Sequence, residues 1–235
     1  MTEYPMRINK YLALKNICSR READGLIEAG KIKINNKRAV LGDKVQENDV
    51  VKVAQNCQKK LFYYAYNKPM GIITHSPQGE KEKSIMDIVK IPQKVYPIGR
   101  LDKDSWGLII LTNDGRITDK VLNPEKKHEK EYAVRVNKIM KDSFIDKMAR
   151  GVRLDGGYKT KECKVQKINE GMFSIILTEG KKRQIRRMCS ALGYNVVDLK
   201  RVRIMSIKIK SLKPGEFREI KGDELKNFLL ELGLK

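Results

Sequence analysis

The chain has 235 residues, enough for a large domain with or without a small one, and 40% of them are hydrophobic, which supplies a real core. Its formal net charge of +21 predicts a polyanionic partner, with nucleic acid as the first candidate. The apolar runs are too short to predict a membrane span or a secretory leader. The four cysteines lack metal-binding spacing, so a zinc site is not expected. We therefore expect a cytoplasmic protein.

Residues 1–54 have the pattern of a small α/β module. Apolar residues at helical spacing predict a first helix within 8–14. Ser19 and Glu22 have the spacing of a capping box, so a second helix is predicted after Ser19, and Gly30 is expected to end it.

Short strands are predicted to complete this module. Residues 32–34 alternate as a strand does, and Asn35-Asn36 tolerates the positive φ of a tight turn. Further short strands are predicted around the valines, which are Val45, Val50, Val51 and Val53.

The module resembles the S4 RNA-binding domain. The resemblance rests on residues 7–12 (RINKYL), 19–23 (SRREA) and 27–35 (IEAGKIKIN), with a departure at Asn36, where the family commonly has glycine. It implies that Arg20, Arg21 and Lys31 face RNA phosphates. The alternative is an ordinary solvated helix face.

Polar residues 55–60 (QNCQKK) are predicted to be a linker, and residues 61–235 a second domain. Strands are predicted at 61–66, 107–112, 130–136, 162–168, 172–178 and 195–208. Helices are predicted near 114–122, 141–150, 181–192 and 223–232, with Asp223 as the last N-cap. Interleaved elements, with a hairpin signal at Asp155-Gly156-Gly157, indicate an α+β domain on a mixed or antiparallel sheet.

Asp102 is the first candidate for chemistry, because it stands between the cations Arg100 and Lys103 and before an apolar run at 108–111. A metal site with Asp104 would need more convergent oxygen ligands, and along an extended segment the two carboxylates would point to opposite sides. Taken alone, an aspartate in such a string is more often a turn or cap residue, so both interpretations stay open.

Other segments favour catalysis on RNA. Residues 130–136 form a predicted strand in which Tyr132 shares a face with Val134 and Val136, and a tyrosine in such a position is usually part of the core. Residues 179–188 form a strand-to-helix turn rich in cations, and the stretch 181–218 holds 12 basic and 2 acidic residues. Cations at a helix N-terminus are favourable only where a phosphate or carboxylate also sits there.

Together, these segments resemble the pseudouridine synthases of the RsuA/RluB/RluE/RluF family, and most closely the RluF type. The resemblance runs from about Met6 to Ile209 and includes residues 67–71 (NKPMG) and 111–115 (LTNDG); Ser105 departs from the more common threonine. It implies an S4 (αL-motif) domain followed by a catalytic domain, built on a mixed, largely antiparallel sheet with flanking helices.

The resemblance also implies residue roles. Asp102 would be the catalytic aspartate, Tyr132 would pack on the target base, Arg186 would pair with the aspartate, and Leu199 would line the uracil pocket. Arg100 would fill the gap that the base leaves or bind its phosphate. Further RNA contacts are expected from Lys103, Arg183, Gln184 and Arg187.

We therefore expect an enzyme without cofactor or metal that isomerises a specific uridine in ribosomal RNA, in the first place 23S; 16S rRNA and tRNA remain alternatives. The family pattern favours a monomer. The rival from another class is a non-catalytic S4-type RNA-binding protein in ribosome assembly. A glycosidase-like enzyme that removes a base lacks a credible second carboxylate.

Overall fold

The computed structural model describes residues 4–15, 17–54, 60–75 and 82–234. Its contacts divide the chain into a small unit, Met1–Leu61 with Asp114–Asp119, and a large unit, Phe62–Asn113 with Lys120–Lys235. Most of the predicted linker, residues 55–59, lies outside the described part of the chain. No helix in the described part is long and apolar enough to cross a membrane.

The small unit contains two helices, α1 (Ile8–Leu14) and α2 (Arg20–Glu28), as predicted. The capping box is confirmed: the Ser19 hydroxyl accepts from the Glu22 backbone N–H, and the Glu22 carboxylate accepts from the Ser19 backbone N–H. The apolar stripes of both helices pack on the first residue of β2, forming a core that includes Ile8, Leu12, Ile27 and Ile32. These helices thereby hold the polar N-terminus of α2 at the surface.

Short strands complete the small unit. Their bounds are β1 (Met6–Arg7), β2 (Ile32–Ile34), β3 (Lys37–Arg38), β4 (Lys44–Val45) and β5 (Val51–Val53). β1 pairs with β4, and β2 lies between β3 and β5, in antiparallel pairs. The predicted tight turn is confirmed, since Asn35 and Asn36 have φ values of 48° and 67°.

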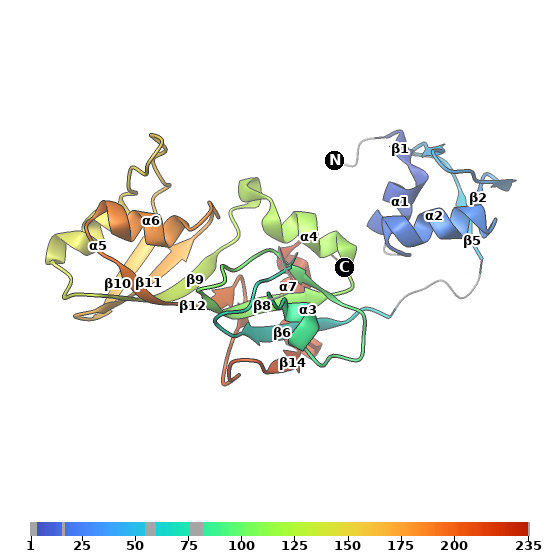
Figure 1. Cartoon of the computed structure of the whole chain (residues 1–235). Coiled ribbons are helices and arrows are strands. Elements are labelled where there is room, and N and C mark those ends of the chain that lie inside the picture. Colours follow the sequence, from blue (N-terminus) through green and yellow to red (C-terminus); the bar gives the residue numbers. More distant parts are fainter. Residues whose placement is uncertain (1–3, 16, 55–59, 76–81, 235) are drawn as a thin grey trace. The chain divides into compact units, whose positions relative to one another are not determined.

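The large unit is built on a mixed sheet with the order β10-β11-β9-β12-β8-β6-β14, visible across the middle of Figure 1. Its strands are β6 (Tyr63–Lys68), β7 (Tyr96–Ile98), β8 (Trp106–Thr112), β9 (Lys130–Val136), β10 (Lys164–Asn169), β11 (Met172–Leu177), β12 (Val196–Ile204), β13 (Ile207–Lys208) and β14 (Phe217–Glu219). Among the described strands, β12 and β8 pair in parallel, whereas the other pairs are antiparallel. The predicted α+β architecture is therefore confirmed.

Two helices, α5 (Asp142–Ala149) and α6 (Gln184–Ala191), lie over the β10-β11-β9-β12 half of this sheet (Figure 1). Their apolar side chains, Phe144 and Met148 from α5 and Ile185 and Met188 from α6, join the core formed by the inner faces of β9, β11 and β12. Packing against this core fixes the start of α6, where the cations of the strand-to-helix turn lie.

The remaining helices are α3 (Ile85–Ile88), α4 (Gly115–Leu122) and α7 (Gly222–Glu231), with a 3-10 turn at Pro124–Lys126. The expectation that Asp223 caps α7 is wrong: the N-cap is Lys221, and Asp223 lies in the first turn. A carboxylate there still favours the helix, because it faces the positive end of the helix dipole.

Candidate active site

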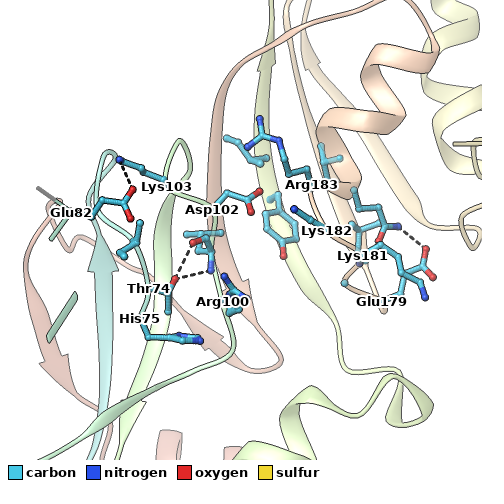
Figure 2. Close-up of a pocket in the computed structure, with 18 residues that line it drawn as sticks. Thr74, His75, Glu82, Arg100, Asp102, Lys103, Glu179, Lys181, Lys182 and Arg183 are labelled. Atoms are coloured by element: carbon cyan, nitrogen blue, oxygen red, sulfur yellow. Dashed lines mark hydrogen bonds and ion pairs between the residues drawn. The ribbon is translucent and has the colours of Figure 1, made fainter. Parts of the chain in front are cut away.

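A cavity of about 780 Å³ lies in the large unit, between the loop that precedes β8 and the turn that joins β11 to α6. Figure 2 shows Thr74, His75, Glu82 and Lys103 on one side of it and Glu179, Lys181, Lys182 and Arg183 on the other, with Asp102 between them. Its volume is in the range of small-molecule sites. The parallel pairing of β12 with β8, Arg201 opposite Gly107, brings the two walls together.

Asp102 lies in the wall of this cavity, four residues before β8 begins. Its backbone carbonyl accepts from the Ser105 N–H at 3.1 Å, which closes a turn over residues 102–105 rather than the extended segment that we expected. Its half-buried carboxylate makes no hydrogen bond or ion pair with any described residue. The oxygens of Asp102 therefore remain available to a ligand in the cavity.

Tyr132 and Leu199 line the same cavity. They come from the adjacent strands β9 and β12, where Leu199 pairs with Val134 and Arg201 with Tyr132. Both side chains also pack on the core under α6, so their positions are set by the sheet and not by a loop. A ring and an aliphatic side chain near a carboxylate suit a flat, partly apolar ligand such as a nucleobase.

The expectation that Arg186 pairs with Asp102 differs from the structure. The Arg186 guanidinium donates to the Asp104 carbonyl at 2.7 Å and lies 3.2 Å from the Asp104 carboxylate. Arg183 holds the same carboxylate in a bidentate pair at 2.8 and 3.0 Å. Burial raises the pKa of Asp104, but the hydrogen bond from Arg183 and the charges of both arginines outweigh it, so the pKa lies below its usual range.

The Asp104 carboxylate supplies the negative charge that the cations at the N-terminus of α6 require. Arg183 is the N-cap of α6 and adopts a left-handed backbone with φ 51°, and Arg186 follows in the first turn. Asp104, from the turn before β8, neutralises part of their charge. The pKa of Arg183 is raised, first by its hydrogen bond to Asp104 and also by the charge of Asp102. The charges of Arg183 and Asp102 therefore interact across the cavity.

The other predicted RNA contacts divide into two groups. Arg100 and Lys103 line the cavity; Arg100 is exposed, without a side-chain partner among the described residues, and Lys103 pairs with Glu82 at 2.9 Å. Arg187 lies outside the lining and donates to the Asp155 carbonyl.

The expectation that Gln184 contacts RNA is not supported by the structure. Its side chain is buried, although it reaches the cavity wall. The amide nitrogen donates to Glu179 at 2.6 Å, and the amide oxygen accepts from the Lys181 N–H at 3.0 Å. Glu179 also accepts from the hydroxyl of Tyr158. Gln184 and Glu179 therefore shape the cationic turn, because their polar groups are used within it.

Several residues of the cavity were not identified from the sequence. The high density of positive charge in their turn could have identified Lys181 and Lys182 as site residues, whereas no pattern in the sequence indicated a site at Thr74 or His75. Burial, together with the charge of Arg100, lowers the pKa of His75, which favours the neutral imidazole. No group of three or more His, Cys, Asp or Glu side chains in the described part of the chain could hold a metal ion.

Lys68, at the end of β6, is a buried cation behind the cavity. Its ammonium donates to the carbonyls of Pro69 at 2.9 Å and Ile72 at 2.6 Å. Burial and the charge of Arg201 lower its pKa to about 8, although Asp102 and Asp104 act in the opposite direction. Lys68 therefore lies close enough to Asp102 for their charges to interact.

We expect Lys68 to make stability rise with alkaline pH. Its pKa is 10.5 in the unfolded chain and about 8 in the folded one, so between these values the unfolded state binds more protons. The free energy of unfolding should be measured by urea titration for the wild type and for Lys68→Met. Between these two pKa values, the wild-type value minus the variant value should increase with pH, by up to about 1.4 kcal/mol per pH unit. Lys130, whose pKa is also lowered to about 8, is common to both proteins. A difference that stays constant over this range would contradict the prediction.

The small unit has a basic hollow of about 310 Å³. Its lining includes four cations, Arg7, Lys10, Arg20 and Lys44. Their side chains make no hydrogen bond or ion pair with other described residues. Of the predicted S4 contacts, only Arg20 lies there, since Arg21 and Lys31 are exposed outside the lining. Arg7, Lys10 and Lys44 were not identified from the sequence, because the pairing of β1 with β4 brings Lys44 opposite Arg7, and Lys10 joins them from the first turn of α1.

Comparison with known proteins agrees with these features. The family described as RNA pseudouridylate synthase matches residues 62–191, and the S4 domain matches residues 6–51. The chain is 46% identical to the dual-specificity RNA pseudouridine synthase RluF of Salmonella typhi, over 96% of this chain and 79% of that protein. It is 35% identical to the ribosomal large subunit pseudouridine synthase B of Bacillus subtilis, over 94% of each. A crystal structure of a pseudouridylate synthase superposes with a TM-score of 0.69 at 26% identity, covering 97% of this chain and 99% of that one.

Proposed function

The chain belongs to the RNA pseudouridylate synthases and carries an S4 domain, and from this premise we propose that it converts a specific uridine of large-subunit ribosomal RNA to pseudouridine, with Asp102 as the nucleophile. The observation that carries the proposal is the Asp102 carboxylate, which lines the cavity without a partner among the described residues. A side chain already used in the fold would not be free to react.

The reaction needs what this cavity can supply. Isomerisation breaks the bond between the ribose and N1 of uracil and rejoins the ribose to C5, without redox chemistry or an external group. A carboxylate nucleophile can split this step into easier ones through a covalent intermediate. Tyr132 is proposed to pack on the base, and Leu199 to form the apolar wall of the uracil pocket.

The target base must first leave its stack, which costs roughly a few kcal/mol. Stacking on Tyr132 and phosphate contacts from Arg100 and the lysines of the β11–α6 turn are proposed to offset that cost. Arg183 and Arg186 are proposed to act through Asp104, holding the turn that carries Asp102 rather than pairing with Asp102 itself.

The substrate class rests on the relatives. A Bacillus subtilis protein of this family is named for the ribosomal large subunit, whereas RluF is named as a dual-specificity RNA enzyme, which favours a second RNA class as an additional substrate. Unmodified transcripts of 23S rRNA, 16S rRNA and tRNA should be incubated separately with the chain, and pseudouridine mapped by carbodiimide adducts. We expect a stop at one or a few positions of 23S rRNA. Tight RNA binding without any modified uridine would favour the non-catalytic assembly protein.

We also propose that the enzyme is a cytoplasmic monomer. In support, a single chain contributes Asp102, Tyr132, Leu199 and the cavity cations. Sedimentation of the purified chain and fractionation of the cells that produce it test these two points.

We expect the basic hollow of the small unit to bind RNA phosphates. Reversing two of its cations, with Arg20→Glu and Lys44→Glu together, should weaken rRNA binding by about tenfold or more, because each cation lost removes a phosphate contact. If the wild type neutralises about six phosphates of looped RNA, its log affinity should fall with log salt at a slope near −4, and the loss of two of these contacts should make the slope of the variant shallower by about 1.4.

The matched control is Arg21→Glu with Lys31→Glu, which makes the same charge change on exposed residues outside the hollow. Binding should be measured by filter retention over a series of salt concentrations. Equal weakening in both double variants would contradict a role for the hollow and favour the broader S4 face. Melting curves of both variants should match that of the wild type, because the side chains replaced make no hydrogen bond or ion pair with other described residues.

A further inference from the structure

The turn that carries Asp102 is held by partners along its whole backbone. The Arg201 guanidinium donates to the Arg100 carbonyl at 3.3 Å, and the Gly71 N–H donates to the Lys103 carbonyl at 2.8 Å. Arg186 donates to the Asp104 carbonyl at 2.7 Å. The Asp102 side chain is the exception, since it has no partner among the described residues. Its direction therefore depends on the backbone that carries it.

Thr74 holds the peptide unit directly before Asp102. Its hydroxyl donates to the Leu101 carbonyl at 2.9 Å and accepts from the Leu101 N–H at 3.0 Å, the two dashed lines that meet at Thr74 in Figure 2. Thr74 is 3% exposed and Leu101 9%, so loss of the Thr74 hydroxyl would leave two polar groups of a buried residue without these bonds. A single hydroxyl thus satisfies both polar groups of one buried residue.

This contact differs from the others that hold the turn. Arg201 and Gly71 each bind only a carbonyl of the turn, whereas the Thr74 hydroxyl binds both the N–H and the carbonyl of Leu101. The two hydrogen bonds of the Thr74 hydroxyl restrict rotation of the backbone at Leu101 about the chain axis. Such a rotation would change the direction of the Asp102 side chain. A displacement of about 1 Å in a reacting group can lower a rate by about 10²-fold.

We propose that Thr74 is a positioning residue of the isomerisation, which aims the Asp102 carboxylate into the cavity through its two bonds to Leu101. The inference rests on the proposed function, because it assumes that Asp102 reacts with the RNA. Thr74 acts through the backbone of Asp102, so its loss should slow the chemical step and leave RNA binding almost unchanged.

The test compares side chains that differ only in the hydroxyl. Thr74→Val replaces the hydroxyl with a methyl group, and Thr74→Ala lacks the oxygen that Thr74→Ser keeps. The single-turnover rate of pseudouridine formation at saturating RNA, the Kd for that RNA and the melting temperature should be measured for each. We expect valine and alanine to lower the rate by about 10- to 100-fold with Kd within about twofold of the wild type, and serine to restore most of the rate.

Thr160→Val is the matched control for a merely structural loss. Thr160 is also 3% exposed, lies in the large unit outside the cavity lining, and accepts from the Val152 N–H at 2.9 Å. It should lower the melting temperature without lowering the single-turnover rate. Equal rates for Thr74→Val and wild type, or equal rate losses in the Thr74 and Thr160 variants, would overturn the inference. If Thr74→Val does not fold, the alanine and serine pair decides by the same criterion.

Failure of the inference is distinguishable from failure of the proposed function. An active wild type with an equally active Thr74→Ala would refute only the role of Thr74. A wild type that binds rRNA and forms no pseudouridine in any RNA would refute the function on which the inference rests.

Discussion

Asp102→Asn is expected to abolish pseudouridine formation, with a loss on the order of 10⁴-fold or more. The amide is nearly the same size as the carboxylate but is a poor nucleophile, so the covalent step cannot proceed. The Asp102 side chain has no partner among the described residues, and the substitution should therefore change the free energy of unfolding by no more than about 0.5 kcal/mol. Single-turnover assays on 23S rRNA, with carbodiimide mapping, measure the effect.

RNA affinity separates this loss from a binding defect. The carboxylate shares its cavity with several cations, so removing its charge should leave the Kd for RNA unchanged or lower it. Asp146→Asn, on the exposed side of α5 in the same unit, is the matched control and should keep the wild-type rate. Modification that persists in Asp102→Asn at the wild-type rate would rule out Asp102 as the nucleophile.

Gly107→Ala is expected to destabilise the large unit by about 3–5 kcal/mol. Gly107 is buried, with φ 113°, where β8 runs in parallel beside β12. A Cβ at this position would lie 2.3 Å from the Arg201 carbonyl oxygen and 2.6 Å from its nitrogen, and both are backbone atoms that cannot rotate away. The strands would have to separate near Asp102 and Leu199, and activity should fall with stability.

Urea unfolding followed by circular dichroism measures this prediction. The matched control is Gly171→Ala, in the turn between β10 and β11, where φ is not in the left-handed region and the nearest atom to the new Cβ is at 3.9 Å. Its free energy of unfolding should change by less than about 1 kcal/mol. Comparable stability of the two variants would mean that β8 and β12 can move apart more easily than their backbone contact indicates.

Much of the fold could be predicted from patterns within single segments. Helical spacing predicted α1, α2 and α5, and the capping box at Ser19 predicted the start of α2 within one residue. Strand patterns predicted β8 and β9 to within a residue. The helices and strands that were missed, β1, β3, α3, β7 and β14, have two to four residues, too few for a period to appear in the sequence. Neighbouring strands and side chains, not local preference, define such short elements.

The candidate site was predicted in part. The sequence segments around Asp102, Tyr132 and Leu199 identified three residues that line one cavity in the structure. Their roles stay predictions until the variants are tested. Arg186 was assigned to Asp102 and instead contacts Asp104, and Gln184 was assigned to RNA and instead joins Glu179. Residue type alone does not distinguish a cation that meets a ligand from one that meets a carboxylate of the fold.

The sequence by itself determined the two-module organisation and the charge that suits a polyanion, because these depend on residue types and spacing along the chain. Asp102 became the candidate nucleophile through the family resemblance of several separate segments, not through its own segment alone. Only the tertiary structure decided which groups hold Asp102. Arg186 and Asp104 are 82 residues apart, and Thr74 and Leu101 are 27 apart. Such contacts form because the sheet and the α6 core bring distant segments within about 3 Å, a distance at which hydrogen bonds are made and at which sequence spacing carries no information.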